Sequence, residues 1–342
     1  MKTVIDFLNN LVWNSPEAFP ILVAFLVGTG IFITIRLGFV QLQHFKHAIN
    51  VTRGKYDNPE DDGDVTHFQA LTTALSATIG IGNIAGVALA IHYGGPGTLF
   101  WMWVTGIFGT SLKFTECTLS LKYRKINPDG SASGGPMYYM EKALGWKGLA
   151  IVFAFATAIS SLGQGNAVQA NTVADIVTNV IKDDFMYSHH LAGGMIVKGG
   201  FVLSQYITGI ILTLIVALVI IGGIKRIGNV TKILAPGMTI LYVLGGVTIL
   251  LYNIQELPNA FSAIFKGAFA PKGVAGGTAA SVFLLTLVHG VKRGLFSNEA
   301  GQGSAAIAHS AAKTTEPVRE GTVAMLGPYI DTIVICTITG LC

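Results

Sequence analysis

The sequence contains little charge. Asp, Glu, Lys and Arg together make up only 12% of its 342 residues, whereas soluble domains carry roughly 25%. Hydrophobic residues make up 51%, and the mean hydropathy is +0.59. So few polar side chains would not cover the surface of a water-soluble body of this size. The composition therefore excludes an ordinary cytosolic enzyme, a disordered chain and a nucleic-acid-binding tail.

Cysteine and the short motifs of common enzymes are also scarce. The three cysteines, Cys117, Cys336 and Cys342, lie in or beside apolar runs without zinc-ligand spacing, so we expect structural thiols. The sequence has no GxxxxGK[ST] loop for ATP, no HExxH pair and no Ser/His arrangement for nucleophilic catalysis. It also has no recognisable ion-filter segment. These absences argue against an ATP-driven pump, an intramembrane enzyme, a bound cofactor or transition metal, and a channel.

Long apolar runs are what the sequence has instead. A bilayer core of about 30 Å needs about 20 apolar helical residues to cross it, and several uncharged stretches meet that need. The stretches between them are polar and rich in turn residues, and the charged stretch Ala48–Val65 is expected to be a loop. The predicted spans are Phe19–Arg36, Phe68–Tyr93, Gly97–Leu121, Gly148–Ile181, Phe201–Ile224, Ile233–Tyr252, Ala279–Ala312 and Thr322–Cys342.

The basic residues indicate the orientation of these spans. With the N-terminus outside, most Lys and Arg fall in inner loops, among them Arg53, Lys55, Lys225 and Arg226. Few fall in the outer segments. An excess of Lys and Arg marks the cytoplasmic side of a membrane protein, so we expect the N-terminus to lie outside.

Two of the predicted spans contain features that interrupt a helix. The segment Ser76–Gly86 has three glycines around Asn83, and the segment Phe296–Ser304 has a carboxylate, two amides and two glycines. Glycine lets the backbone leave helical geometry, although it can instead serve close helix packing. The orientation makes the two spans run in opposite directions. Two broken spans of opposite direction are typical of inverted-repeat transporters.

Three longer motifs resemble a known family. The segments GNIAGVALAIHYGGPGTLFWMW (Gly82–Trp103), SLGQGNAVQANTVAD (Ser161–Asp175) and GLFSNEAGQGSAAIAH (Gly294–His309) are similar to the alanine/glycine:cation symporters, also called sodium:alanine symporters. The resemblance implies uptake of alanine or glycine across a prokaryotic inner membrane, with Na⁺ as the coupling ion and no cofactor. The alternative is a proton-coupled amino-acid transporter, or another small-solute permease of the same fold.

The resemblance also implies a fold. It is an all-α polytopic, LeuT-like arrangement of two inverted repeats of five helices, which together form a single transporter domain over residues 1–342. Helix 19–36 would stand in front, the first repeat would cover 66–253, and the second would begin in 279–342. After the second broken span only Thr322–Cys342 follows. We therefore expect a C-terminally truncated member of the family, whose second repeat is incomplete.

The first interrupted segment is a predicted binding site. An amino-acid substrate carries a carboxylate, which suits the free N–H groups and partial positive charge at the N-terminus of a half-helix. Na⁺ is a hard cation that prefers oxygen, so carbonyl and hydroxyl groups suit it. The predicted carboxylate ligands are the N–H groups of Gly82, Asn83, Ile84, Ala85 and Gly86, and the predicted Na⁺ ligands are oxygens of Ser76, Thr78 and Gly80.

The second interrupted segment supplies polar side chains. We expect Ser297 and Asn298 to bind substrate, and Glu299 either to neutralise the substrate's ammonium group or to orient the break. A carboxylate within a membrane span is a functional residue by default. The alternative for Glu299 is a salt bridge to Lys292 or Arg293.

Polar residues on other spans have expected places as well. Gln164 and Gln169 are expected to face the central cavity and bind substrate, and the alternative is hydrogen bonding between helices. Lys113 and Glu116 are three residues apart and should form a structural pair on one helix face. Asp331 should be an interior hydrogen-bonding residue.

Overall fold

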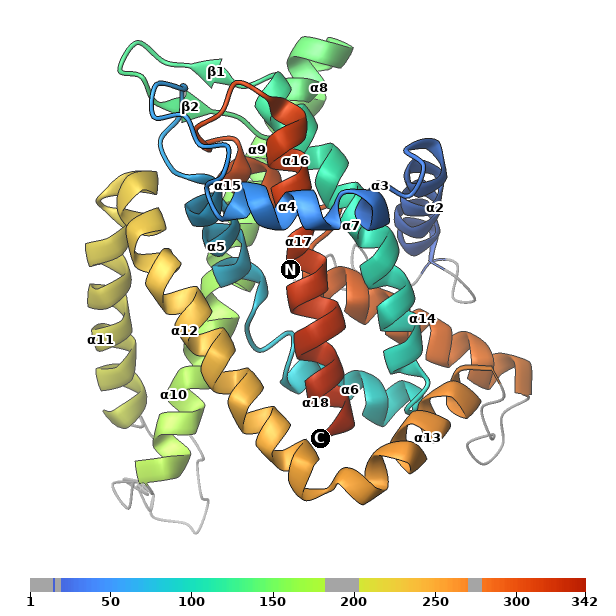
Figure 1. Cartoon of the computed structure of the whole chain (residues 1–342). Coiled ribbons are helices and arrows are strands. Elements are labelled where there is room, and N and C mark those ends of the chain that lie inside the picture. The colour runs from blue at the N-terminus through green and yellow to red at the C-terminus, as the bar shows by residue number, and fades with distance from the viewer. Residues whose placement is uncertain (1–14, 16–19, 182–202, 270–278) are drawn as a thin grey trace. The chain divides into compact units, whose positions relative to one another are not determined.

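The computed structural model describes residues 15, 20–181, 203–269 and 279–342 of the chain (Figure 1). Helices dominate these residues, as the hydropathy pattern predicts, and two short strands form one antiparallel hairpin. The chain divides into two compact units. Unit 1 is Met1–Ile151 with Gly228–Cys342, and unit 2 is Val152–Ile227.

Unit 1 begins with the first predicted span, the first broken span and a long helix. Proline at the first position of α8 and a left-handed glycine after its last residue give this helix the usual start and stop signals. The elements up to residue 144 are α2 (Ile21–Arg36), α3 (Val40–Gln43), α4 (Phe45–Thr52), α5 (His67–Thr78), α6 (Ala85–Gly94), α7 (Thr98–Lys122), β1 (Lys125–Ile126), β2 (Ala132–Ser133) and α8 (Pro136–Leu144).

Unit 2 contains most of one long helical run and the helix after it, and α12 leads back into unit 1. The remaining helices belong to unit 1. In chain order these elements are α9 (Lys147–Ser160), the π-helix η1 (Ser161–Ala167), α10 (Val168–Ile181), α11 (Leu203–Ile220), α12 (Gly223–Tyr252), the 3₁₀-helix η2 (Ile254–Glu256), α13 (Leu257–Phe269), α14 (Ala279–Asn298), α15 (Ser304–His309), α16 (Pro317–Ala324), α17 (Leu326–Pro328), the π-helix η3 (Tyr329–Cys336) and α18 (Thr337–Leu341).

Helix α7 is the central packing element of unit 1, in contact with α2, α14, α15 and α16. Two of its glycines allow this close approach. A Cβ on Gly109 would lie 3.1 Å from the Cβ of Ala300, and a Cβ on Gly106 would lie 3.0 Å from the Cγ2 of Thr332. Small residues at helix contacts let backbones approach closely where helices pack in lipid. The polar ends of α14 and η3 are therefore held tightly against α7.

Apolar side chains cover the outside of unit 2. On α11, Ile210, Leu214 and Leu218 are each at least 60% exposed. A large apolar surface is unusual on a water-soluble monomer, but it carries little cost in lipid, which is equally apolar. In the described part of the chain, three helical runs are long and apolar enough to cross a membrane, namely Lys147–Val180, Gly223–Tyr252 and Pro317–Leu341. The chain is an integral membrane protein.

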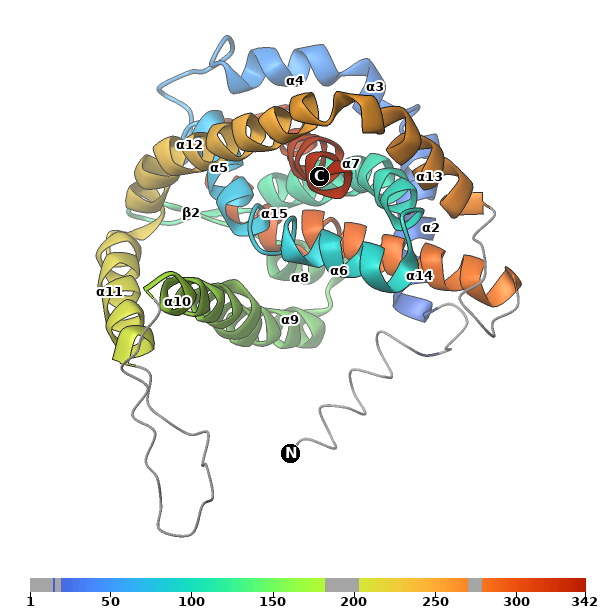
Figure 2. The same ribbon diagram turned by 90° about the horizontal axis from the view of Figure 1, so that it is seen from below.

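The predicted break in the first span is present. Helix α5 starts at a capping box, in which the Thr66 side chain accepts a hydrogen bond from the N–H of Gln69 and the Gln69 side chain accepts one from the N–H of Thr66. The helix ends at Thr78, where Ile79 turns to an extended conformation, and α6 begins at Ala85. Figure 2 shows α6 beside α14, and contacts between the two helices join the broken spans.

The predicted break in the other span is present too. Between α14 and α15, Glu299, Gly301 and Gly303 have φ angles of +52°, +81° and +83°. These left-handed values are incompatible with a right-handed helix, and they are unfavourable for any residue with a Cβ. Glycine occupies two of these three left-handed positions, and Glu299 occupies the third.

The boundaries of several spans differ from the predicted ones. The span predicted to end at Ile224 ends at Ile220 in α11. Helix α12 begins at Gly223 instead of Ile233, so Lys225 and Arg226 lie on a helix and not in a loop. Lys and Arg are good helix formers, and their long side chains carry the charge away from the apolar stem. The last span begins at Pro317, in the first helical turn, where proline is favoured.

The expected loop Ala48–Val65 is partly helical. Helix α4 extends to Thr52, and Ala48 and Val51 on one of its faces are fully buried. Burial of this apolar face offsets the charged residues that the sequence shows around it. The remainder of the stretch forms turns that lead to α5.

Candidate functional site

A buried polar cluster joins the two helix breaks. Asn83 lies in the first break and is fully buried, and Ser297 and Asn298 at the end of α14 are each 1% exposed. The Asn83 amide (Nδ2) donates a hydrogen bond to the Ser297 hydroxyl at 2.9 Å and another to the carboxylate of Asp331 in η3. Three of the predicted ligands therefore meet in one place. We call Asn83, Ser297, Asn298, Asp331 and Thr332 the central cluster.

Asp331 is the main acceptor of the central cluster. Besides the Asn83 amide, the hydroxyls of Ser297 and Thr332 donate to Asp331 Oδ2 at 3.0 and 2.9 Å. Asn298 Nδ2 in turn donates to Thr332 Oγ1 at 3.2 Å. Asp331 is fully buried, which confirms its expected interior role. A buried carboxylate is costly unless it accepts hydrogen bonds of this kind.

A carboxylate on α7 forms a hydrogen bond with the unwound backbone of the second break. The N–H of Gly303 donates to Glu116 Oε2 at 3.1 Å, and Glu116 Oε1 lies 3.8 Å from Lys113 Nζ, which confirms the predicted pair. Within the break, Asn298 Oδ1 accepts a hydrogen bond from the N–H of Ala300 at 3.0 Å. An unwound backbone in a membrane needs such partners, because lipid supplies none. Glu116 therefore stabilises the broken geometry.

Glu299 bonds to a different neighbour. Its side chain is half-buried, and its carboxylate accepts a hydrogen bond from the hydroxyl of Ser304, the first residue of α15. The guanidinium of Arg293, a suggested partner for Glu299, donates instead to the carbonyl of Gly82. Glu299 is thus bonded to α15 and not to the central cluster.

Arg293 lies against the first break. A Cβ on Gly82 would be 3.1 Å from Arg293 Nη2, and a Cβ on Gly86 would overlap the guanidinium. The guanidinium also lies over the ring of Phe296, 4.9 Å from the ring centre. The glycines of the first break therefore serve close packing against α14 as well as the break itself.

Some N–H groups of the first break already form hydrogen bonds within the break. Those of Asn83, Ile84 and Gly86 donate to carbonyls within the break at 3.1 to 3.2 Å. This leaves the N–H groups of Gly82 and Ala85 for an anion, as far as the described residues show. The predicted anion site is thus smaller than the sequence suggests, because the turn itself forms these hydrogen bonds.

The predicted Na⁺ ligands surround the end of α5. The hydroxyl of Ser76 donates to the Thr73 carbonyl at 2.7 Å, and that of Thr78 donates to the Leu75 carbonyl at 3.4 Å. The N–H of Gly80 donates to the side chain of Asn83. A hydroxyl that donates its proton keeps its oxygen lone pairs, so these oxygens retain the capacity to ligate a cation.

The remaining predicted ligands lie in unit 2. Gln164 is part of η1 and Gln169 is on α10. Short π-helical segments are frequent at functional sites, and this one interrupts an otherwise α-helical run. On the same helix, Asn171 Nδ2 donates to Asp175 Oδ2 at 3.0 Å, and Gln205 of α11 donates to Asp175 Oδ1 at 3.2 Å. That Gln164 and Gln169 face the substrate stays a prediction.

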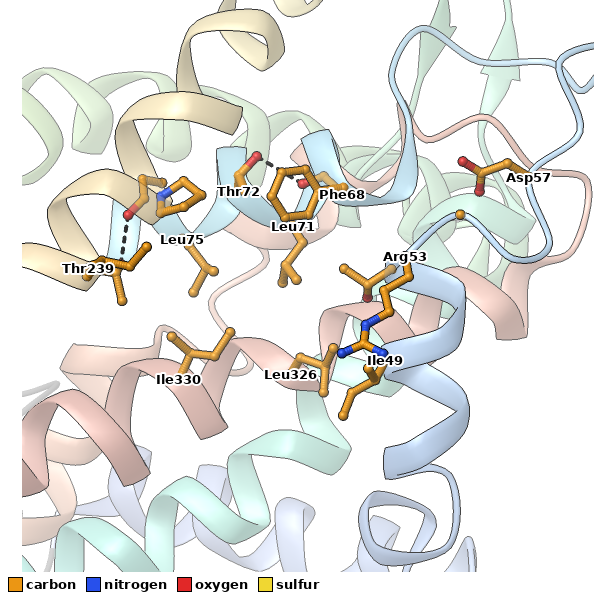
Figure 3. Close-up of a pocket in the computed structure, with 15 residues that line it drawn as sticks. Ile49, Arg53, Asp57, Phe68, Leu71, Thr72, Leu75, Thr239, Leu326 and Ile330 are labelled. Atoms are coloured by element: carbon orange, nitrogen blue, oxygen red, sulfur yellow. Dashed lines mark hydrogen bonds between the residues drawn. The ribbon is translucent and has the colours of Figure 1, made fainter. Parts of the chain in front are cut away.

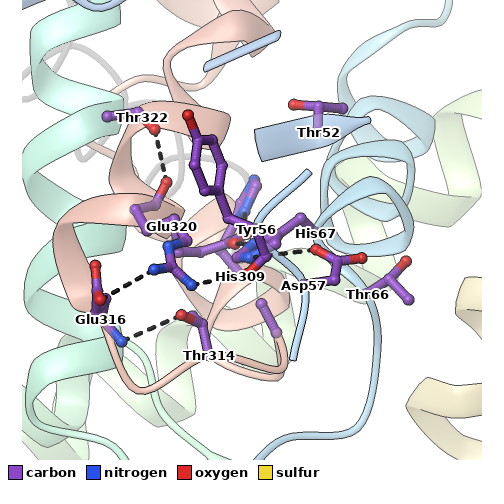
Figure 4. Close-up of polar contacts among 12 residues, drawn as sticks. Thr52, Tyr56, Asp57, Thr66, His67, His309, Thr314, Glu316, Glu320 and Thr322 are labelled. Atoms are coloured by element: carbon purple, nitrogen blue, oxygen red, sulfur yellow. Dashed lines mark hydrogen bonds and ion pairs between the residues drawn. The ribbon is translucent and has the colours of Figure 1, made fainter. Parts of the chain in front are cut away.

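Sequence reasoning missed a second buried cluster. The carboxylate of Glu320 on α16 contacts Nδ1 of His67, the first residue of α5, and Nδ1 of His309, the last residue of α15 (Figure 4). All three residues are at most 1% exposed. Glu320 therefore ties a half-helix of one broken span to a half-helix of the other. The available signal was the position of two histidines, one directly before a broken span and one at the end of the other.

The charge of this cluster affects His67, which lies just before the predicted span Phe68–Tyr93. Burial lowers the pKa of His67, but the hydrogen bond and negative charge of Glu320 outweigh burial, so the pKa is raised above its usual value. The carboxylate of Asp57, 3.8 Å from His67 Nε2, acts in the same direction. Within the described residues, no group of three or more His, Cys, Asp and Glu side chains is arranged to hold a metal ion.

The loops at the same ends of the broken spans are bonded to each other. Val65, just before α5, forms a parallel bridge with Ala312, just after α15. The guanidinium of Arg124 donates to the carbonyls of Asp62, Ser310, Ala312 and Thr314. The two broken spans are therefore joined at their ends by Glu320 and Arg124 and in their middles by the central cluster.

Comparison with known proteins identifies relatives of the whole chain. The sequence model of the sodium:alanine symporter family matches residues 1–342. The sodium/alanine symporter AgcS of Methanococcus maripaludis is 44% identical, over 99% of this chain and 69% of its own length. An uncharacterised transporter of Haemophilus influenzae is 40% identical, over 100% and 69%. The putative sodium/proton-dependent alanine carrier protein YrbD of Bacillus subtilis is 38% identical, over 99% and 63%.

These matches bear on one expectation from the sequence. The family match extends over residues 1–342, and it gives no support to the expected truncation within the second repeat.

Proposed function

Because the chain belongs to the sodium:alanine symporter family, we propose that it carries a small neutral amino acid, alanine or glycine, into the cell together with Na⁺. The family is one of transporters and not of enzymes, and no cofactor enters the proposal. The protein lies in the inner membrane of a prokaryotic cell, with its N-terminus outside.

One observation carries this proposal. The first break and the end of α14, where the second break begins, are bonded to each other through Asn83, Ser297 and Asp331 in a buried cluster. Unwound backbone inside a membrane is tolerated where it is buried in protein or lines a cavity, and transporters place their substrates at such breaks. The same two breaks supply the oxygen and N–H groups that an amino acid and Na⁺ require.

In the proposed site, the substrate carboxylate binds at the N-terminus of α6, and the ammonium group faces the second break. Glu299, the first residue of that break, supplies the negative charge. The N–H donors are those of Gly82 and Ala85, helped by Asn83, Ile84 and Gly86 when the turn opens. The other proposed ligands are Ser297, Asn298, Gln164 and Gln169 for the substrate, and oxygens of Ser76, Thr78 and Gly80 for Na⁺.

The proposal includes the architecture. The two broken spans begin two inverted repeats of a LeuT-like fold, the first over 66–253 and the second from 279, with helix 19–36 in front. The opposite course of the two broken spans, inferred from the Lys and Arg distribution, supports this arrangement.

Uptake of labelled alanine into proteoliposomes tests the function. An inward Na⁺ gradient should drive accumulation above the external concentration, and an equal K⁺ gradient should not. Counterflow in Na⁺ without a net gradient should also occur, because a symporter exchanges internal and external substrate. Alanine uptake that is unaffected by removal of Na⁺ would contradict the proposal.

A second coupling ion has a specific reason to be tested. The relative YrbD carries a name that includes both sodium and proton dependence. A proton-coupled amino-acid transporter predicts uptake driven by an inward pH gradient in the absence of Na⁺. Accumulation with a pH gradient alone would favour this alternative.

A further inference from the structure

An apolar groove of about 680 Å³ lies on unit 1, and its lining residues do not include those of the central cluster (Figure 3). Its walls come from α4, α5, α12 and the helical run through α17 and η3. Most of the side chains along it are aliphatic or aromatic, with Leu71, Leu75, Ile240, Leu326 and Ile330 among them, and the polar ones are three threonines, Arg53 and Asp57. The volume is within the range of sites that hold one small organic molecule or one hydrocarbon chain.

The groove lies among segments that cross the membrane. Helix α5 is the first half of a predicted span, and α12 and the run Pro317–Leu341 are both long and apolar enough to cross. On α12, Ile240 lines the groove and is 57% exposed, so the groove is open at the surface of this apolar helix. The exposed surface of a membrane span faces lipid, and the natural occupant of an apolar groove there is an acyl chain.

One end of the groove carries a positive charge. Arg53 follows α4 directly, and Figure 3 shows its guanidinium directed toward Ile49 and Leu326 in the groove. No acidic partner for this exposed guanidinium is present in the described part of the chain. Asp57 also lines this end, but its carboxylate lies 3.8 Å from His67. Arg53 therefore has free capacity for an anionic oxygen group such as a phosphate.

We propose that this groove binds an anionic glycerophospholipid, with one acyl chain along α5, α12 and η3 and the phosphate on Arg53. Basic pockets between spans on the cytoplasmic side bind anionic headgroups, and Arg53 belongs to an inner loop in the proposed orientation. The lipid would contact α5, a half-helix of the first broken span, so its binding would bear on how that half-helix moves. The inference rests on the membrane orientation of the proposed function but not on the transported substrate.

Native mass spectrometry of the purified full chain tests the site. Phosphatidylglycerol and phosphatidylcholine with identical acyl chains serve as probes. The protein should retain phosphatidylglycerol in preference, and Arg53→Gln should reduce that preference about fivefold, the effect of one basic residue near an anionic surface. Lys55→Gln is the matched control. It removes the same charge two positions further along the chain, and the Lys55 side chain does not line the groove.

A second pair of variants tests the acyl-chain part. Ile240→Trp fills the groove and should reduce binding of both lipids. Leu241→Trp adds the same bulk to a neighbouring, 74% exposed position of α12 outside the groove, and should leave binding unchanged. Equal retention of the two lipids by the unmodified protein, an equal effect of Arg53→Gln and Lys55→Gln, or an unchanged Ile240→Trp variant would each overturn the proposal. Because the readout is lipid retention, these results are independent of whether alanine is transported.

Discussion

At the scale of single residues, Asp331 is the group on which the central cluster depends. Asp331→Asn replaces one carboxylate oxygen by an amide N–H₂, so at least one of the donors Asn83, Ser297 and Thr332 loses its acceptor. A buried donor without a partner costs about 1–3 kcal/mol. We expect a lower melting temperature in detergent and a strong loss of alanine uptake.

Asp175→Asn is the control for this variant, because Asp175 is an exposed carboxylate that also accepts two amide hydrogen bonds. Its effect on the melting temperature should be small. Equal melting temperatures and equal uptake for Asp331→Asn and the unmodified protein would remove Asp331 from the mechanism.

The contact between Gly86 and Arg293 gives a prediction that combines two substitutions. Gly86→Ala places a methyl group where the guanidinium lies, so Arg293 must leave the Gly82 carbonyl. Arg293→Gln loses the same hydrogen bond by another route, at a cost of about 1.5–3 kcal/mol. The double variant should therefore be little worse than either single one when unfolding is measured in detergent. Additive losses would show that the two residues act independently.

His67 predicts a pH dependence of stability. A group whose pKa is raised by folding stabilises the folded state fully below its ordinary pKa of 6.5, and this contribution is lost as the pH rises through the raised value. The difference in melting temperature between the unmodified protein and His67→Gln should therefore shrink as the pH increases above 6.5. A difference that grows with pH would refute the assignment.

At the scale of the elements, the second break depends on left-handed glycines. Gly303→Ala places a Cβ at a φ of +83°, which costs roughly 1–2 kcal/mol. It also disturbs the hydrogen bond that the Gly303 N–H donates to Glu116. We expect reduced thermal stability and reduced uptake. Gly327→Ala in α17, where a Cβ would meet no atom within 4 Å, should leave both unchanged. If the two variants behave alike, the left-handed geometry is not required.

The existence of both breaks could be predicted from sequence, because glycines and polar residues interrupt apolar runs at Ser76–Gly86 and Phe296–Ser304. Their partners could not be predicted. Glu116 reaches the second break from α7, and Asp331 reaches the first from η3, and these contacts depend on how distant helices pack. For the same reason the link through Glu320 was missed, since its two histidines show no shared spacing.

At the scale of the whole molecule, the apolar composition correctly predicts a helical membrane protein, and three long motifs correctly predict its family. The start of α12 was predicted wrongly, because a helix can continue beyond the apolar part of a span into Lys225 and Arg226. The spacing of apolar residues in the sequence also did not show that α4 buries one of its faces.

The small side chains at the two breaks predict a narrow substrate range. Gly82, Ala85 and Ser297 have small side chains or none, and Arg293 and Phe296 pack against Gly82. In competition with labelled alanine, glycine and alanine should displace the label, whereas leucine and phenylalanine should not. Inhibition by leucine as strong as that by alanine would contradict the size limit.

The sequence separation within the central cluster has a consequence for biosynthesis. Asn83 bonds to Ser297, 214 positions later, and to Asp331, 248 positions later. At a translation rate of about 5–20 residues per second, the first break emerges roughly 10–50 s before its last partner has been made. During that interval its amide and unwound backbone have no partners from the later spans. The nascent first span must therefore wait in a hydrated or protein-lined environment, such as that of the insertion machinery, until η3 arrives to complete it.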